Sequence, residues 1–197
     1  MYHTNFVHLH VHSHYSILDG AASIKSIIET ARRNRMPAIA ITDHGNMFGA
    51  IDFYQNAIKK GVKPILGFEA YLTGGSRLDK ERSKEKPLHH LVLLAKNHAG
   101  YKNLVKLSSL GYTEGFYYKP RIDWELLEKY HDGIIALGAC LQGEVPWKLN
   151  HGDEEGARKA VRRYQDVFGR DNFYLEIQNH GLAEQIDVLP KIVSMAR

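Results

Sequence analysis

The sequence predicts an α/β fold, a (β/α) barrel whose parallel strands alternate with helices on the outside. Two observations predict it. Short apolar runs alternate with segments of helical periodicity, and polar side chains recur where the expected strands end, namely His10 and His12, Asp43 and His44, Glu69, Cys140 and His180. The C-terminal ends of barrel strands form one mouth, where these side chains should meet. A doubly wound open sheet is the alternative, but that fold usually has a glycine-rich phosphate turn after its first strand, where this chain has histidines.

The expected strands are apolar runs bounded by glycine, proline or polar residues. The first lies at Val7 to Val11, where apolar residues alternate with histidines at the period of a strand. The second begins after Pro37 and ends before Asp43. From the second onwards, the strands are expected at residues 38–42, 64–72, 91–95, 133–137 and 173–177.

The expected helices combine an apolar face with capping residues at their ends. Ser23 can cap a helix whose isoleucines recur on one face. Gly61 can close the second helix as its C-terminal cap, and Asp123 can cap a later one. The helices are expected at residues 23–35, 50–60, around 101–107, 123–130, 153–168 and 182–196.

The histidines of the first strand predict a metal or catalytic site. They stand at alternate positions, so they share one face of the strand, and an aspartate, Asp19, follows them; they are His8, His10, His12 and His14. Neutral imidazole is the commonest protein metal ligand and suits zinc, manganese and iron. A polar strand face whose histidines bind backbone or water is the alternative, and it explains a single histidine better than four in register.

The composition indicates a single soluble domain. With 197 residues, of which 44% are hydrophobic and 24% charged, the chain is long enough for one domain with a proper core. Its net charge of +4 favours an anionic partner, although scattered surface lysines would give the same sum. One cysteine excludes an internal disulfide and fits a reducing cytoplasm. No signal peptide or membrane span is expected.

Five stretches of the chain closely resemble one family. They are HLHVHSHYSILDG, ITDHGNMFGAIDFYQNAIKKGVKPILGFEAYL, HLVLLAKNHAGYKNL, GFYYKPRID and LEIQNHG. They resemble the PHP (polymerase and histidinol phosphatase) domains at the N-terminus of bacterial DNA polymerase III alpha subunits. The resemblance covers residues 1–197 as one domain and implies a distorted (β/α)7 barrel that holds up to three divalent metal ions.

The resemblance also implies a set of metal ligands. The family motif falls on His10, His12, Asp19, His44, Glu69, His90 and Cys140, and the ions would be zinc, manganese or iron, with magnesium possible. His90 is preferred to His89 on the motif alone, because from the residues themselves that pair is undecided: His90 begins its apolar run, whereas barrel ligands are expected at strand ends. Without the resemblance, Cys140 would be taken as a small core residue.

Two functions follow from the resemblance. Some polymerase members of the family are metal-dependent 3′–5′ exonucleases, with phosphoesterase chemistry, whereas in others the domain is a scaffold that stabilises the polymerase or docks a proofreading subunit. The ligand motif is intact at the seven positions named above, which favours the enzyme, with His12, His44, Glu69 and Asp43 as catalytic candidates. Glu69 can bridge two ions because a carboxylate has two oxygens, and Asp43 either orients a ligand or caps the following turn. A free-standing phosphatase for small molecules is a third hypothesis.

The expected partners are DNA with a single-stranded 3′ end and the remainder of a polymerase chain, a DNA-directed nucleotidyltransferase that acts in replication. Tyr118, Lys119 and Arg121 combine aromatic and cationic groups suited to nucleic acid, or they form a surface that packs on the polymerase. The polar stretch 73–87 is either a solvated loop or a basic flap over the site. The family's last ligands, an Asp-x-His pair after a seventh strand, have no counterpart. We therefore expect a truncated barrel that either self-associates or is locally disordered at its C-terminal end.

Overall fold

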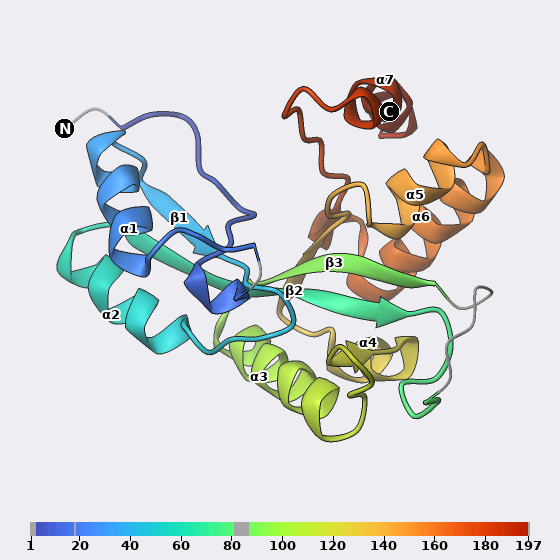
Figure 1. Ribbon diagram of the computed structural model, residues 1–197, viewed down its shortest axis with the longest axis horizontal. Coiled ribbons are helices and arrows are strands. Elements are labelled where there is room, and N and C mark those ends of the chain that lie inside the picture. The colour runs from blue at the N-terminus through green and yellow to red at the C-terminus, as the bar shows by residue number, and fades with distance from the viewer. Residues whose placement is uncertain (1–2, 18, 81–86, 197) are drawn as a thin grey trace.

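The computed structural model describes residues 3–17, 19–80 and 87–196 and confirms a mixed α/β fold (Figure 1). Its strands lie in the order β1-β2-β3-β5-β6, and β4 pairs with the end of β2 beside this path. Within the described residues the sheet does not close into a complete barrel, which is compatible with the distorted and truncated barrel that was expected. The strands are β1 (Ala38–Ile41), β2 (Lys63–Thr73), β3 (Leu88–Ala95), β4 (Arg121–Ile122), β5 (Ile134–Leu137) and β6 (Phe173–Tyr174).

One strand, β3, corrects the expectation of an all-parallel sheet. It is antiparallel to both of its neighbours, β2 and β5, whereas β1, β4 and β6 each pair in parallel. A parallel connection needs a crossover, usually a helix, and the described residues between β2 and β3 contain none. The chain therefore turns back after β2, so that the beginning of β3 lies beside the end of β2, with His90 opposite Tyr71.

The expected first strand is an irregular extended segment. It runs beside β1 through two main-chain hydrogen bonds, from Ala40 N to His8 O (2.9 Å) and from Thr42 N to Val11 O (2.8 Å). The two acceptors, His8 and Val11, are farther apart in sequence than the two donors, Ala40 and Thr42. An extra residue in one of two paired segments has this effect, and it disrupts the regular ladder of hydrogen bonds. Leu9, expected on the packed face, is 38% exposed.

The helices follow the expected order, with one addition, α5. Ser23 and Asp123 cap α1 and α4 as expected, since their side chains accept hydrogen bonds from Ser26 N and Leu126 N. Gly61 follows α2 with a φ of 71°, a conformation that glycine adopts without strain. None of these helices, within the part of the chain described, is long and apolar enough to cross a membrane. They are α1 (Ile24–Arg33), α2 (Ala50–Lys59), α3 (His98–Thr113), α4 (Trp124–Tyr130), α5 (Glu144–Asn150), α6 (Glu154–Phe168) and α7 (Ala183–Met195).

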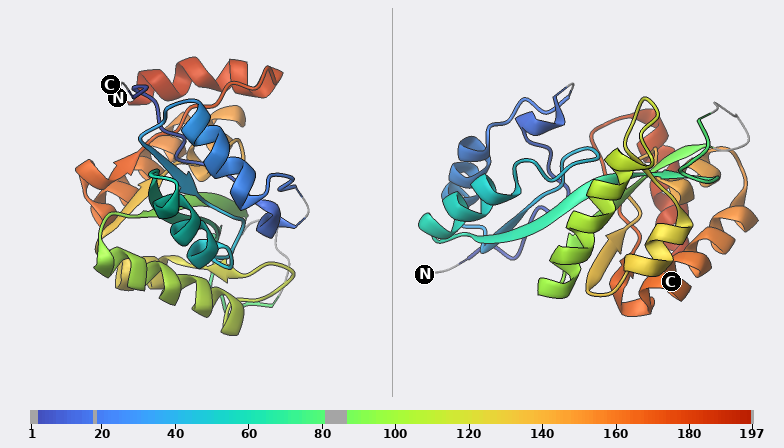
Figure 2. Two further views of the ribbon diagram at one scale, coloured as in Figure 1. Left: turned by 90° about the vertical axis from the view of Figure 1, so that its left-hand side faces the viewer. Right: turned by 90° about the horizontal axis from the view of Figure 1, so that it is seen from below.

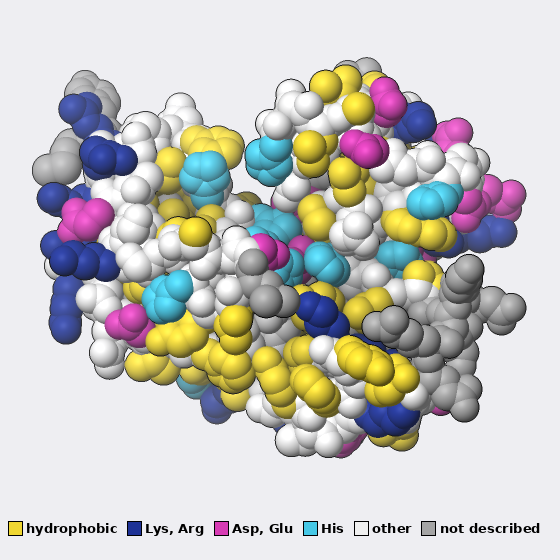
Figure 3. Space-filling view, viewed as in Figure 1, with side chains coloured by type: hydrophobic (Ala, Val, Ile, Leu, Met, Phe, Trp, Pro, Cys, Tyr) yellow, Lys and Arg dark blue, Asp and Glu magenta, His cyan; other side chains and the backbone are white. Residues whose placement is uncertain are grey.

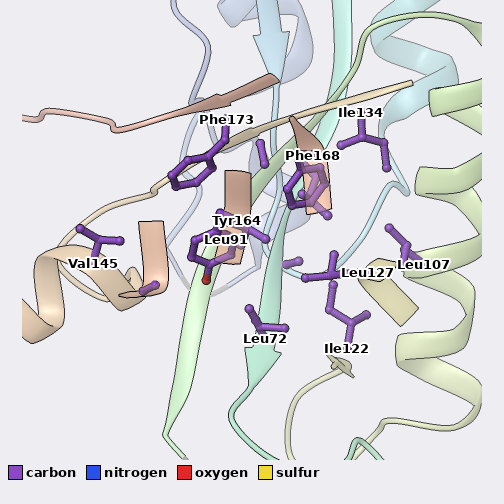
Figure 4. Packing of buried hydrophobic residues seen from close by; sticks show 14 of the residues in the cluster. Leu72, Leu91, Leu107, Ile122, Leu127, Ile134, Val145, Tyr164, Phe168 and Phe173 are labelled. Carbon is purple, nitrogen blue, oxygen red and sulfur yellow. The ribbon is translucent and has the colours of Figure 1, made fainter. Parts of the chain in front are cut away.

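The hydrophobic core has two main parts. The long strand β2 runs between the groups of helices that surround these two parts (Figures 1 and 2). The larger part contains side chains from the sheet and from α3 to α7, with α7 packed on α5. Figure 4 shows its side chains from β2, β3 and α6 converging. The smaller part joins α1 and α2 to β1. Alternation along β2 separates the faces: Phe68, Ala70 and Leu72 enter the larger core, so Glu69 and Tyr71 lie on the opposite face.

Candidate metal centre

Glu69 lies at the centre of the site, and imidazoles surround it. Its carboxylate is 1% exposed, on the face of β2 turned away from the large core. His10 Nε2 and His90 Nδ1 lie 3.3 and 3.1 Å from its Oε1. His12 Nε2 and His44 Nδ1 lie 3.6 and 2.6 Å from its Oε2. The structure therefore brings together residues from the first segment, the end of β1, β2 and the start of β3.

The donor atoms form two overlapping groups of metal-ligand type. One consists of His10, His12 and Glu69, and the other of His44, Glu69 and His90, with the ligand atoms of each group within 4.8 Å of one another. Both Glu69 oxygens and His44 Nδ1 are buried, and within the described residues none of them has a hydrogen-bond partner in suitable geometry. Buried polar atoms normally have partners. Imidazole and carboxylate groups whose buried atoms lack a hydrogen-bond partner form a ligand set that fits a divalent cation.

The turn that carries His12 is held by the buried Asp43. Its carboxylate accepts hydrogen bonds from Ser13 N (2.6 Å), Ser13 Oγ (2.8 Å) and Ser16 Oγ (2.7 Å). Ser16 Oγ in turn lies 3.4 Å from His12 Nδ1 and accepts a hydrogen bond from His44 N (3.2 Å). Asp43 thus holds the turn of residues 13–16 and, through Ser16, contacts His12, which favours the orienting role predicted for it. These hydrogen bonds reach the first segment and not the turn that follows Asp43.

The reversal of β3 explains why His90 reaches the site from the start of its strand. The C-terminal ends of β2 and β5 lie beside the N-terminal end of β3, so all three contribute to the same mouth. His89, on the other face, is buried against Trp147, and its Nδ1 lies 3.3 Å from Gln142 O. The structure therefore places His90 and not His89 beside Glu69.

Two further predicted ligands lie at the edge of this cluster. Asp19 Oδ2 is 2.8 Å from His44 Nε2, and more than half of its side chain is exposed. Cys140 Sγ, after β5, lies 3.7 Å from His90 Nδ1. Burial, together with the charge of Glu69, raises the pKa of the Cys140 thiol to about 11, so a cation that binds the thiolate must displace its proton.

The negative charge of the Glu69 carboxylate is balanced by protons on neighbouring histidines. Burial by itself raises the pKa of the Glu69 carboxyl, but the surrounding histidines outweigh it and hold that pKa well below its usual range. Burial lowers the pKa of His10, yet its contacts with Glu176 and Glu69 raise it to about 10. Burial and the neighbouring His44 lower the pKa of His12. One buried carboxylate thus faces imidazoles of unequal basicity, a typical setting for a functional site.

Sequence reasoning missed Glu176, which contacts His10 directly. Glu176 Oε1 lies 2.7 Å from His10 Nδ1 and accepts a hydrogen bond from Gln178 Nε2 (2.8 Å). Its position just after β6 could have identified it, because polar residues at strand ends are candidates for the site. For this strand the candidate from the sequence is His180 instead. The main-chain N–H of His180 donates to Gln185 Oε1 (2.7 Å), and His180 is among the residues that line the cleft.

The cluster lines a cleft of about 1470 Å³. Figure 3 shows histidine side chains gathered in the hollow near the middle of this face. One wall is the first segment and the other is the chain after β6. Lys119 also lines the cleft, with its Nζ 3.4 Å from Tyr71 Oη and 5.0 Å from the centre of the Tyr71 ring. A cationic group thus stands beside the imidazole cluster.

The structure separates the three residues expected to contact nucleic acid. Tyr118 is 68% exposed and Lys119 lines the cleft. Arg121 is buried, and its guanidinium donates to the carbonyls of Gly115, Arg77 and Asp79. That guanidinium is occupied within the fold, so Arg121 is corrected to a structural residue, and the prediction of nucleic-acid contact stays with Tyr118 and Lys119.

The polar stretch 73–87 is only partly described. Residues 81–86, which belong to the proposed flap, lie outside the described residues. The preceding part is anchored: Arg77 pairs with Glu114, Asp123 and Glu125, and Lys80 donates to the carbonyls of Glu114 and Phe116. Arg77 and Lys80 therefore tie this part of the stretch to the α3–α4 region, although Leu78 and Lys80 remain exposed to solvent.

A comparison with solved structures supports the fold. The chain is similar to a crystal structure described as a putative metal-dependent phosphoesterase from Bifidobacterium adolescentis. The TM-score is 0.53 at 12% identity, over 98% of this chain and 85% of that one. At this identity the similarity concerns the fold alone.

Comparisons of sequence assign the family. The chain is 50% identical over 195 residues to the DNA polymerase III subunit alpha of Borreliella burgdorferi, covering 98% of this chain and 17% of the relative. It is 51% identical over 188 residues to that of Deinococcus radiodurans, covering 91% of this chain and 14% of the relative. The chain thus spans about one sixth of the length of these curated relatives. The profile of the PHP domain family matches residues 8–180, and the chain therefore belongs to the PHP domain family.

Proposed function

We propose that this chain carries a divalent-metal phosphoesterase site that hydrolyses phosphodiester bonds at the 3′ end of single-stranded DNA. The observation that carries this proposal is the shared carboxylate, Glu69, which belongs to both groups of metal-ligand type. Two cations held by one bridging carboxylate would lie close enough to act on the same phosphate.

The residues have separate roles in this proposal. The ions, which would supply Lewis acidity to the phosphate and to water, would be held by His10, His12, Asp19, His44, Glu69, His90 and Cys140. Asp43 keeps His12 in position through Ser16. Lys119 holds the phosphodiester backbone by charge, since its ammonium lines the same cleft.

We further propose that the chain acts as the PHP domain of a bacterial DNA polymerase III alpha subunit in the cytoplasm. The high identity to relatives of that name over nearly the whole chain supports this placement. In this setting the partners are DNA, the rest of the polymerase chain and other replication subunits, among them a proofreading subunit. The site would then remove nucleotides from a primer end, close to where the polymerase extends it.

The test compares metal content with hydrolysis in the same samples. Metal is measured by plasma mass spectrometry after exposure to zinc or manganese, and hydrolysis by digestion of a 5′-labelled single-stranded DNA. His12→Ala and Glu69→Ala should lose both, while His98→Ala on α3 and Glu184→Ala on α7 should keep both.

Two outcomes would contradict the proposal. A wild-type chain that binds metal without cleaving DNA, alone or in the longer polymerase, would favour the metal-stabilised scaffold. A wild-type chain that binds neither metal would show that the histidines are structural.

A further inference from the structure

We propose that Glu176 is the positioning residue for His10, and that it directs His10 Nε2 toward the metal centre. This inference rests on the proposed metal site and adds to it a carboxylate from the far wall of the cleft. Glu176 and His10 stand 166 positions apart in sequence, and their side chains meet at 2.7 Å.

The two nitrogens of the His10 ring face two different carboxylates. Nδ1 faces Glu176 Oε1 at 2.7 Å, and Nε2 faces Glu69 Oε1 at 3.3 Å. In the neutral form that can bind a cation, the imidazole carries one proton, so a ring that donates Nδ1–H to Glu176 presents the lone pair of Nε2 on the side of Glu69. A carboxylate behind a ligating histidine fixes its tautomer and orientation in this way, and it makes the ligand more basic.

Gln178 fixes Glu176 in its turn. Gln178 Nε2 donates to Glu176 Oε1 (2.8 Å) and lies 3.2 Å from His10 Nδ1. The second oxygen, Glu176 Oε2, is buried and accepts no hydrogen bond from the described residues. A buried carboxylate oxygen without a hydrogen-bond donor lowers the stability of the fold. The contact with His10 gives Glu176 a functional reason to lie at this position.

The other imidazoles of the cluster are oriented differently. His12 Nδ1 has the hydroxyl of Ser16 at 3.4 Å, and His44 Nε2 has Asp19, itself an expected ligand, at 2.8 Å. Among these three histidines, and counting only carboxylates of the described residues, His10 alone has one outside the expected ligand set. Loss of Glu176 should therefore affect the group of His10, His12 and Glu69 more than the group of His44, Glu69 and His90.

The experiment compares Glu176→Gln and Glu176→Ala with Glu184→Gln, which makes the same charge change on α7. Zinc affinity is measured by competition with a chelator, and the Nδ1 proton of His10 is observed by ¹H–¹⁵N NMR in the metal-free protein. In the wild type this proton should be downfield and protected from exchange. Glu176→Ala should abolish the resonance, and Glu176→Gln should shift it upfield.

Zinc affinity should fall about 10- to 100-fold in both Glu176 variants, the range typical for loss of a ligand's outer partner. Glu184→Gln should leave both the affinity and the proton unchanged. Affinity within twofold of wild type in both Glu176 variants, with the His10 proton unmoved, would overturn the inference. The NMR readout needs no metal, so a wild type that binds no zinc would contradict the proposed function, while the His10–Glu176 pairing would still be tested.

If Glu176→Ala does not fold, the isosteric Glu176→Gln decides the matter together with Gln178→Leu. The latter removes the donor to Glu176 but keeps the carboxylate, so it should move the His10 proton less than Glu176→Gln does. An equal or larger shift would show that Gln178, and not Glu176, positions His10.

Discussion

His90 Nδ1 lies 3.1 Å from Glu69 Oε1 because β3 runs antiparallel to β2. In that register His90 faces Tyr71, and Glu69 lies two residues before Tyr71 on the same side of the strand. Diagonal neighbours of this kind on one face of a sheet are close enough for long side chains to meet. The strand reversal thus completes the group of His44, Glu69 and His90.

Glu69→Gln should remove both metal sites at once. The carboxylate belongs to both groups, and an amide offers one neutral oxygen in place of two charged ones. Zinc affinity should fall by more than the roughly 100-fold upper range for outer partners, which titration calorimetry would measure. Glu144→Gln, which alters a carboxylate bonded to Tyr164 Oη, is the control, and full zinc stoichiometry in Glu69→Gln would contradict the shared site.

Substitutions of Lys119 and Arg121 should have different effects, the first on DNA binding and the second on stability. Lys119→Ala should weaken the binding of a fluorescent single-stranded oligonucleotide, and less so at high salt, with little change in melting temperature. Arg121→Ala should lower the free energy of unfolding by about 2–4 kcal/mol, because buried carbonyls lose a charged donor. Equal loss of DNA binding in two stably folded variants would show that Arg121 also contacts the nucleic acid.

Arg77→Leu should destabilise the fold and leave the metal centre intact. The guanidinium pairs with the buried Asp123, and leucine would leave that carboxylate without its main counter-charge. Breaking a buried pair costs about 3–5 kcal/mol, which urea denaturation would measure. Arg158→Leu removes an exposed pair with Glu154 and should change the stability by less than about 1 kcal/mol. Similar losses of unfolding free energy in both variants would contradict the claim that the buried ion pair contributes more to stability than the exposed one.

The stability of the metal-free protein should depend on pH through His10. Its pKa is raised to about 10 in the folded chain, above the ordinary value near 6.5. The folded state therefore binds this proton more tightly, so the stabilisation is complete below about pH 6.5 and is lost as the pH rises toward 10.

Thermal unfolding in the presence of EDTA, from pH 6.5 to 10, would measure this loss. His10→Asn should flatten the pH profile, whereas His98→Asn on the exposed start of α3 should not. A wild-type melting temperature that stays constant over this range would contradict the assignment.

Much of the fold was predictable from local patterns. The capping side chains of Ser23 and Asp123 mark the starts of α1 and α4 as expected, because a cap depends on residues within one turn. The prediction of a strand for the first segment was wrong, because its hydrogen bonds to β1 do not keep a regular register. Register depends on the partner strand, which the pattern within one segment does not show. The short β4 escaped prediction because two residues carry no periodicity.

The sequence by itself determined the α/β class, the family, and the candidate ligands His10, His12, His44 and Glu69, which lie together in the structure. These follow from alternation and from motifs, which are local properties of the chain. Only the tertiary structure decided the direction of β3, the pairing of Glu176 with His10, and the burial of Arg121. The physical reason is that strand direction and side-chain partners are set by contacts between segments far apart in the chain, which local periodicity does not encode.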